Sequence, residues 1–274
     1  MKRIFVVMML ALMIAGCQGK KKVYYQSDVK VDEELENAKG VDYLTLYIRC
    51  HELDSIKDSA VAAALKGGHP FEALPDSVAK NWDDMIGLIL TRQGERAFQF
   101  YDNHRQSIAD YLRLDFLNYG FITRVYLPYK ATVSTQEEYG DICISELEKE
   151  FIKAQQGLMM GMGVPSHYEN MLMELFHAYV NYGHNDQALD LCNEILAFIQ
   201  VTYGPESENY ANMLNNKANL CNNMGSGYSA AIAAKQAIAI YDKCLAEGGD
   251  EERMAKIAGE KSKLEEKLKL WQGQ

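Results

Sequence analysis

The feature that most constrains the fold is an internal repeat in the C-terminal half of the chain. The five residues YENML at 168–172 recur as YANML at 210–214, an offset of 42 residues. The same offset relates further pairs of equal or similar residues: Gly183 and Gly225, Ala188 and Ala230, Leu196 and Ile238, Ala197 and Ala239. A fixed period of this length is typical of stacked repeats, in which each unit buries its apolar face against the next.

Each unit predicts two helices joined by a glycine-containing turn. We expect helices near 166–182 and 185–202 in the first unit, and near 207–223 and 227–246 in the second. A weaker third unit is expected upstream, because apolar residues recur there at three- and four-residue spacing. They are Ile144, Leu147, Phe151, Ala154 and Leu158.

The last predicted helix carries one apolar stripe among many Lys and Glu residues. The stripe consists of Met254, Ile257, Leu264, Leu268 and Trp271. It is shorter than the three or four heptads of a coiled coil. Stacked repeats need a terminal element that is polar on its outer side, so we interpret residues 250–274 as a capping helix.

The second unit resembles the tetratricopeptide repeat, in the longer variant of about forty-two residues found in kinesin light chains. The stretch NNKANL at 215–220 carries the resemblance, with Ala218, Ala230 and Ala237 at the small positions where paired helices approach. Three residues depart from the pattern: Phe176 at a small position, Lys217 for leucine and Cys221 for tyrosine. The resemblance implies an all-α solenoid of antiparallel helix pairs. The three departures imply that its repeats, over 126–249, are degenerate.

In this family the first helix of each repeat lines a concave groove that binds a protein or peptide. The implied groove residues are Asn170, Met173, His177 and Asn181 in the first unit, and Asn212, Asn215, Asn219, Asn222 and Asn223 in the second. Asparagine is a mediocre helix former, but its amide both donates and accepts hydrogen bonds, as an extended peptide requires. The alternative is a merely solvated polar face. No Lys or Arg occupies these positions, so a clamp for a C-terminal carboxylate is not expected.

The chain begins with Lys2 and Arg3 and an apolar run at 4–14, which is too short to span a bilayer comfortably and indicates a secretory signal. The following residues IAGC at 14–17 resemble the lipobox of bacterial lipoproteins, in which cleavage precedes a cysteine that becomes lipid-modified, here Cys17. We therefore expect a signal peptide at 1–16 and a polar tether at 17–38. Gln18 is not the aspartate that retains enteric lipoproteins in the inner membrane. This favours the periplasmic face of the outer membrane.

Residues 39–125 predict further helices that do not identify a family. We expect two helices at 41–53 and 55–66. An amphipathic helix should follow Pro75 and end at Gly94, and another should stop at 118–120. These helices are either eroded repeats or a separate helical domain.

Composition and motifs argue against several classes of function. The formal charge is -10, and it is -12 once residues 1–16 are removed, so nucleic-acid binding is not expected. No zinc, phosphate-loop or nucleophile-elbow motif occurs, and we expect no catalytic residue, cofactor or metal site. Five cysteines besides Cys17 cannot all pair. A Cu(I) site is the alternative for one group of sulfur and imidazole ligands: Met159, Met160, Met162, Met171 and Met173, with His167 and His177.

The function that we predict is a membrane-tethered protein–protein interaction scaffold of the bacterial cell envelope, without enzymatic activity. A ligand- or glycan-binding envelope lipoprotein is the alternative. It would need a platform of exposed aromatic side chains, for which Tyr24, Tyr25, Tyr126 and Tyr129 are candidates.

Overall fold

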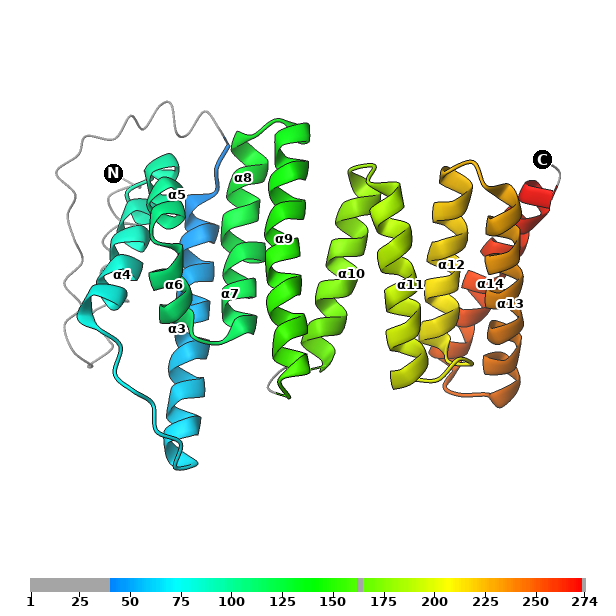
Figure 1. The fold of residues 1–274 in the computed structure, drawn as a ribbon, viewed down its shortest axis with the longest axis horizontal. Helices are drawn as coiled ribbons and strands as arrows, with labels where there is room; N and C mark the ends of the chain where they lie inside the picture. Colours follow the sequence, from blue (N-terminus) through cyan, green and yellow to red (C-terminus); the bar gives the residue numbers. More distant parts are fainter. Residues whose placement is uncertain (1–39, 162–164, 273–274) are drawn as a thin grey trace. The chain divides into compact units, whose positions relative to one another are not determined.

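The computed structural model describes residues 40–161 and 165–272, and all the secondary structure in this part of the chain is helical (Figure 1). This confirms the predicted all-α class. The contacts divide the chain into two units between Leu114 and Asp115, whereas the sequence suggested a boundary after residue 125. The expected signal peptide, tether and Cys17 lie outside the described residues.

Within residues 40–114, the described part of the first unit contains four helices around one buried carboxylate. These are α3 (Tyr43–Lys66), α4 (Asp76–Leu90), α5 (Gly94–Asn103) and α6 (Arg105–Leu112). Asp54 of α3 accepts hydrogen bonds from Tyr111 Oη at 2.6 Å and Trp82 Nε1 at 3.3 Å, and its carboxylate lies 3.3 Å from Lys57 Nζ. The Trp82 and Tyr111 rings stack with centroids 4.9 Å apart. Asp54 thus joins α3 to both α4 and α6.

Three predicted boundaries in this region are wrong. Residues 43–66 form one helix, because nothing near Asp54 breaks the backbone and the carboxylate turns inward to its partners. Helix α4 ends at Leu90, and Gly94 begins α5 instead of ending α4. The expected stop at 118–120 lies inside a helix, and the chain instead breaks at Arg113, whose φ is 52°.

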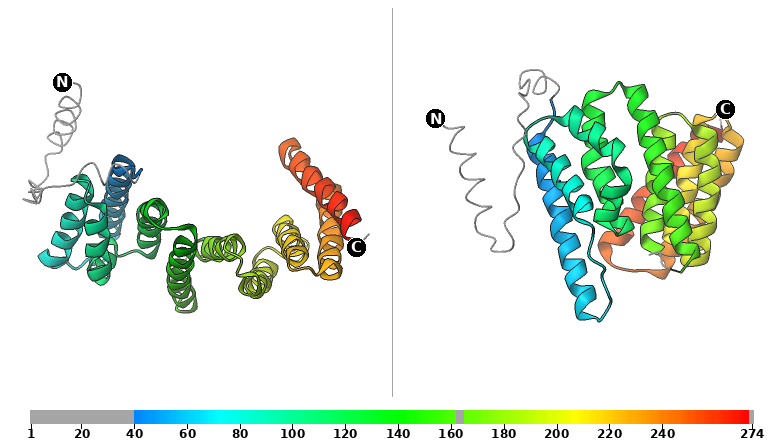
Figure 2. Two further views of the ribbon diagram at one scale, coloured as in Figure 1. Left: turned by 90° about the horizontal axis from the view of Figure 1, so that it is seen from above. Right: turned by 60° about the vertical axis from the view of Figure 1, so that its left-hand side comes forward.

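The second unit begins with three helical segments that follow one another directly, α7 (Asp115–Phe121), the π-helix η1 (Ile122–Tyr126) and α8 (Leu127–Val133). Six antiparallel helices follow: α9 (Gln136–Met159), α10 (Pro165–Asn181), α11 (Asn185–Thr202), α12 (Glu208–Asn223), α13 (Gly227–Glu247) and α14 (Glu251–Gln272). Each of α9 to α13 packs on the next, as Figure 2 shows from above. The helix boundaries predicted for the two repeat units are confirmed to within one or two residues.

The offset of 42 residues recurs in the backbone of the turns. Helices α10 and α12 both end two residues before a glycine in the left-handed region, Gly183 with a φ of 78° and Gly225 with a φ of 79°. Beyond each glycine the next amide donates back into the helix at 2.8 Å, from His184 to Tyr179 O and from Ser226 to Cys221 O. Glycine adopts this conformation without strain, so the repeated glycine sets both turns.

Small residues set the packing of the helix pairs. Ala218, Ala230 and Ala237 are completely buried, and α12 and α13 share the most extensive contact between any two helices described. Phe176, at the position equivalent to Ala218, is also buried, and α10 and α11 contact one another less extensively. Most of the predicted inner faces of α9 and α14 are buried: Ile144, Leu147, Ala154, Ile257, Leu264 and Trp271. The other predicted residues, Phe151, Leu158, Met254 and Leu268, are half-buried.

Candidate functional site

Helix α10 presents one exposed polar stripe. Asn170, His177 and Asn181 are exposed and Met173 is half-buried, while the opposite side of the helix packs into the core. No hydrogen bond engages the Asn170, His177 or Asn181 side chain within the described part of the chain. Asn170, His177 and Asn181 are therefore accessible from solvent, and their predicted role in binding a partner stays a prediction.

The asparagines of α12 are engaged differently. Asn212 Oδ1 accepts a hydrogen bond from Tyr241 Oη of α13 at 2.7 Å, and Asn219 Nδ2 donates to Asn215 Oδ1 at 3.2 Å. Asn219 Oδ1 in turn accepts from Lys267 Nζ of α14 at 2.8 Å. Half-buried Asn212 and Asn219 thus join α12 to α13 and α14, and Asn215 holds Asn219 within α12. The sequence alone did not indicate this structural role.

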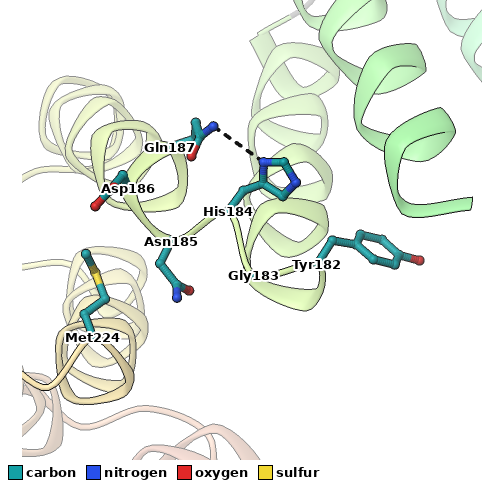
Figure 3. Close-up of a pocket in the computed structure, with 7 residues that line it drawn as sticks. All are labelled: Tyr182, Gly183, His184, Asn185, Asp186, Gln187 and Met224. Carbon is teal, nitrogen blue, oxygen red and sulfur yellow. Dashed lines mark hydrogen bonds between the residues drawn. The ribbon is translucent and has the colours of Figure 1, made fainter. Parts of the chain in front are cut away.

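The remaining two asparagines lie at the end of α12, beside a surface pocket of about 480 Å³. Asn222 is half-buried and Asn223 exposed. The pocket is lined by the α10–α11 turn, the first residues of α11 and the C-cap of α12: Tyr182, Gly183, His184, Asn185, Asp186, Gln187 and Met224. Figure 3 shows Asn185, Asp186 and Met224 on one side, with the Tyr182 ring directed away from them. Gln187 Nε2 and His184 Nδ1 are 3.5 Å apart. The pocket is polar, and its lining begins at Tyr182, the residue that follows the last residue of α10.

Glu174 belongs to the same stripe of α10, although sequence analysis did not select it. It is exposed, lies one helical turn from both Asn170 and His177, and forms no ion pair among the described residues. The missed signal was regional charge: residues 154–216 contain seven carboxylates and no Lys or Arg.

The structure separates the members of the candidate copper cluster. Met171 is completely buried in the core, whereas Met159 and Met160 are 83% and 68% exposed at the end of α9. Met162 lies outside the described residues. Among the residues that are described, no group of three or more His, Cys, Asp or Glu side chains is arranged to hold a metal ion.

Two of the tyrosines proposed for a glycan platform are in the core. Tyr126 and Tyr129 are 4% and 3% exposed, so they do not form a surface platform, and Tyr24 and Tyr25 lie outside the described residues.

The cysteines also give no reactive site. Cys50, Cys143, Cys192, Cys221 and Cys244 are all unpaired. Burial raises the pKa of Cys192 to about 12, which keeps its thiol protonated and unreactive at neutral pH.

No family model matches the chain, and a search of curated proteins finds no match. None of the helices in the described ranges is long and apolar enough to cross a membrane.

Proposed function

We propose that the second unit binds a segment of another protein along the exposed stripe of α10 and the adjoining ends of α11 and α12. One observation carries this proposal: the exposed Asn170, His177 and Asn181 side chains lie on one stripe of a well-packed helix and form no hydrogen bond or ion pair with the described residues. Helices α9 and α11 cover the other sides of α10. A polar row of this kind presents both donors and acceptors, which an extended peptide backbone requires.

The tetratricopeptide resemblance supports the same function. The repeated glycine turns and the buried Ala218, Ala230 and Ala237 are what a stack of such helix pairs needs. In our proposal the helix pairs form a degenerate solenoid, with the first helix of each pair on the binding side. The engaged asparagines of α12 shift the binding surface towards α10 relative to the sequence prediction.

We further propose that the chain is a lipoprotein held through Cys17 on the periplasmic face of the outer membrane. The lipobox-like residues at 14–17 support this location. Anchoring would raise the effective concentration of the binding unit near membrane partners. Mass spectrometry of the native protein should find a lipid-modified Cys17 as the first residue; an unmodified N-terminus elsewhere would refute the anchor.

A pull-down from native membranes with matched variants tests the binding proposal. The first variant carries Asn170→Ala, His177→Ala and Asn181→Ala on the exposed stripe of α10. The control carries Asp190→Ala and Gln200→Ala, exposed residues of α11. Alanine favours helix at all five positions, so both variants should stay folded. We expect a partner that the wild type and the control retain and the α10 variant loses. Equal capture by all three proteins would contradict the proposal.

A further inference from the structure

Arg113 follows α6 in a backbone conformation that arginine rarely adopts. Its φ is 52° and its ψ is -31°, and the next amide, that of Leu114, donates to Leu112 O at 2.6 Å. Glycine adopts a turn of this kind without strain, whereas a residue with a Cβ costs free energy there. The backbone alone would favour glycine, so the arginine side chain contributes something that glycine lacks.

The Arg113 side chain reaches back to the loop between α3 and α4. Its Nη2 donates to the backbone carbonyl of Glu72, 41 residues earlier, at 2.7 Å. Its guanidinium carbon lies 5.3 Å from the centre of the Phe71 ring. An aromatic face and a backbone carbonyl together hold the planar guanidinium in one orientation. Arg113 is therefore preorganised by residues of the first unit.

This guanidinium lines a surface pocket of about 400 Å³. The other lining residues are Pro70, Phe71, Glu72 and Leu114, and three of these four are apolar. A guanidinium has five N–H donors. The half-buried Arg113 forms no hydrogen bond other than that to Glu72, and no ion pair, within the described part of the chain. Most of its donors and its positive charge are therefore free to meet a ligand in the pocket.

We propose that this pocket binds a carboxylate carried by an apolar group. The planar fork of a guanidinium matches the two oxygens of a carboxylate. Pro70, Phe71 and Leu114 would cover the apolar part of the ligand, as in pockets where a few polar groups orient an otherwise apolar molecule. A single guanidinium balances one negative charge, so the pocket favours a carboxylate over a phosphate dianion. All lining residues belong to the first unit, so the site is independent of binding along α10.

Glu72 sets the affinity of this site from the opposite direction. It contacts Arg113 through its backbone carbonyl, while its side chain is exposed and forms no ion pair with any described residue. Its negative charge at the pocket opposes an anionic ligand. Glu72→Gln removes that charge and keeps the carbonyl, so the variant should bind a carboxylate more tightly than the wild type does.

The test titrates the full chain with hexanoate, with hexanamide and with inorganic phosphate, and follows the Leu114 methyl groups by NMR. Hexanoate should shift the Leu114 resonances saturably, and the two other compounds should bind at least about tenfold more weakly. A tripeptide that ends in a free leucine carboxylate identifies the source of the ligand. Tighter binding than hexanoate indicates the C-terminus of a polypeptide, and weaker binding indicates a free organic acid.

Matched variants assign the binding to Arg113. Arg113→Gln should weaken hexanoate at least about tenfold. The control Arg92→Gln removes an arginine from the same unit, also at a positive φ, 61°, and should leave binding unchanged. Circular dichroism checks that both variants fold, and the comparison of ligands on the wild type decides the question even if Arg113→Gln does not. Equal binding of hexanoate and hexanamide, no saturable shift at Leu114, or equal effects of the two arginine variants would overturn the site.

Discussion

Two helical glycines should respond in opposite ways to the same substitution. An added Cβ at Gly140 of α9 would lie 2.6 Å from Cδ1 and 2.9 Å from Cγ of Tyr182, closer than carbon atoms can approach. The same atom at Gly259 of α14 meets nothing within 4 Å. Gly140 therefore makes room for the ring that follows α10, whereas Gly259 only weakens its helix.

The expected changes in unfolding free energy combine two contributions, helix propensity and overpacking. Replacing a helical glycine by alanine stabilises by about 1 kcal/mol at both sites. At Gly140 the ring or the helix must also move, which costs about 1–3 kcal/mol for overpacking. Because the propensity gain is common to both, the unfolding free energies of Gly140→Ala and Gly259→Ala should differ by about 1–3 kcal/mol. Gly259→Ala should be the more stable.

Urea unfolding followed by circular dichroism measures this difference, and a double-mutant cycle identifies its cause. In a Tyr182→Ala background the clash is gone, so Gly140→Ala should become neutral or stabilising. If Gly140→Ala stabilises the wild type as much as Gly259→Ala does, the close packing of Tyr182 on α9 is refuted. If it stays destabilising without the ring, the cause lies elsewhere in α9.

Three further predictions concern the cores of the two units. Asp54→Ala should destabilise the first unit by roughly 3–5 kcal/mol, because it leaves the buried partners of the carboxylate without their acceptor. Tryptophan fluorescence during urea unfolding measures this loss of stability. A loss below about 1 kcal/mol would contradict the prediction. Ala218→Leu should lower the unfolding free energy by about 1–3 kcal/mol, because the larger side chain forces α12 away from α13. Ala239→Leu, on the exposed side of α13, should be nearly neutral. Thermal unfolding compares the two variants, and equal shifts in the unfolding temperature would refute the close approach of the helices. Burial raises the pKa of Tyr168 and of Tyr241 to about 12. The protonated phenols therefore stabilise the fold fully below pH 10, and this stabilisation is lost as the pH rises towards 12. Ultraviolet titration should show that these two phenols ionise only when the protein unfolds. Ionisation near pH 10 in the folded protein would contradict the raised pKa values.

The helices from 165 to 247 were predictable from the sequence because their signals are local. Glycine at 183 and 225 sets the turns, and the 3.6-residue periodicity between them identifies the helices. The region before α8 was harder to predict because two of its breaks occur without glycine. Arg92 and Arg113 adopt positive φ values of 61° and 52°, while Gly120 is buried inside α7 and does not end a helix.

The candidate site was predicted only in part, because hydrogen-bond partners depend on tertiary packing. Nothing in the sequence of α12 shows that Tyr241 and Lys267 reach Asn212 and Asn219 from other helices. Glu174 was overlooked because the candidate residues were taken only from the groove positions that the tetratricopeptide resemblance implies, and Glu174 is not at one of them. The absence of Lys and Arg across the region, which is visible in the sequence, would have drawn attention to it.

Site-specific photo-crosslinking in native membranes tests the central claim most directly. A photoreactive residue at Asn181, at the exposed end of α10, should trap a specific partner protein, and one at Gln200 on α11 should not. Competition by excess unlabelled protein should abolish the adduct. An adduct from Gln200 alone, or from neither position, would contradict binding along the stripe of α10.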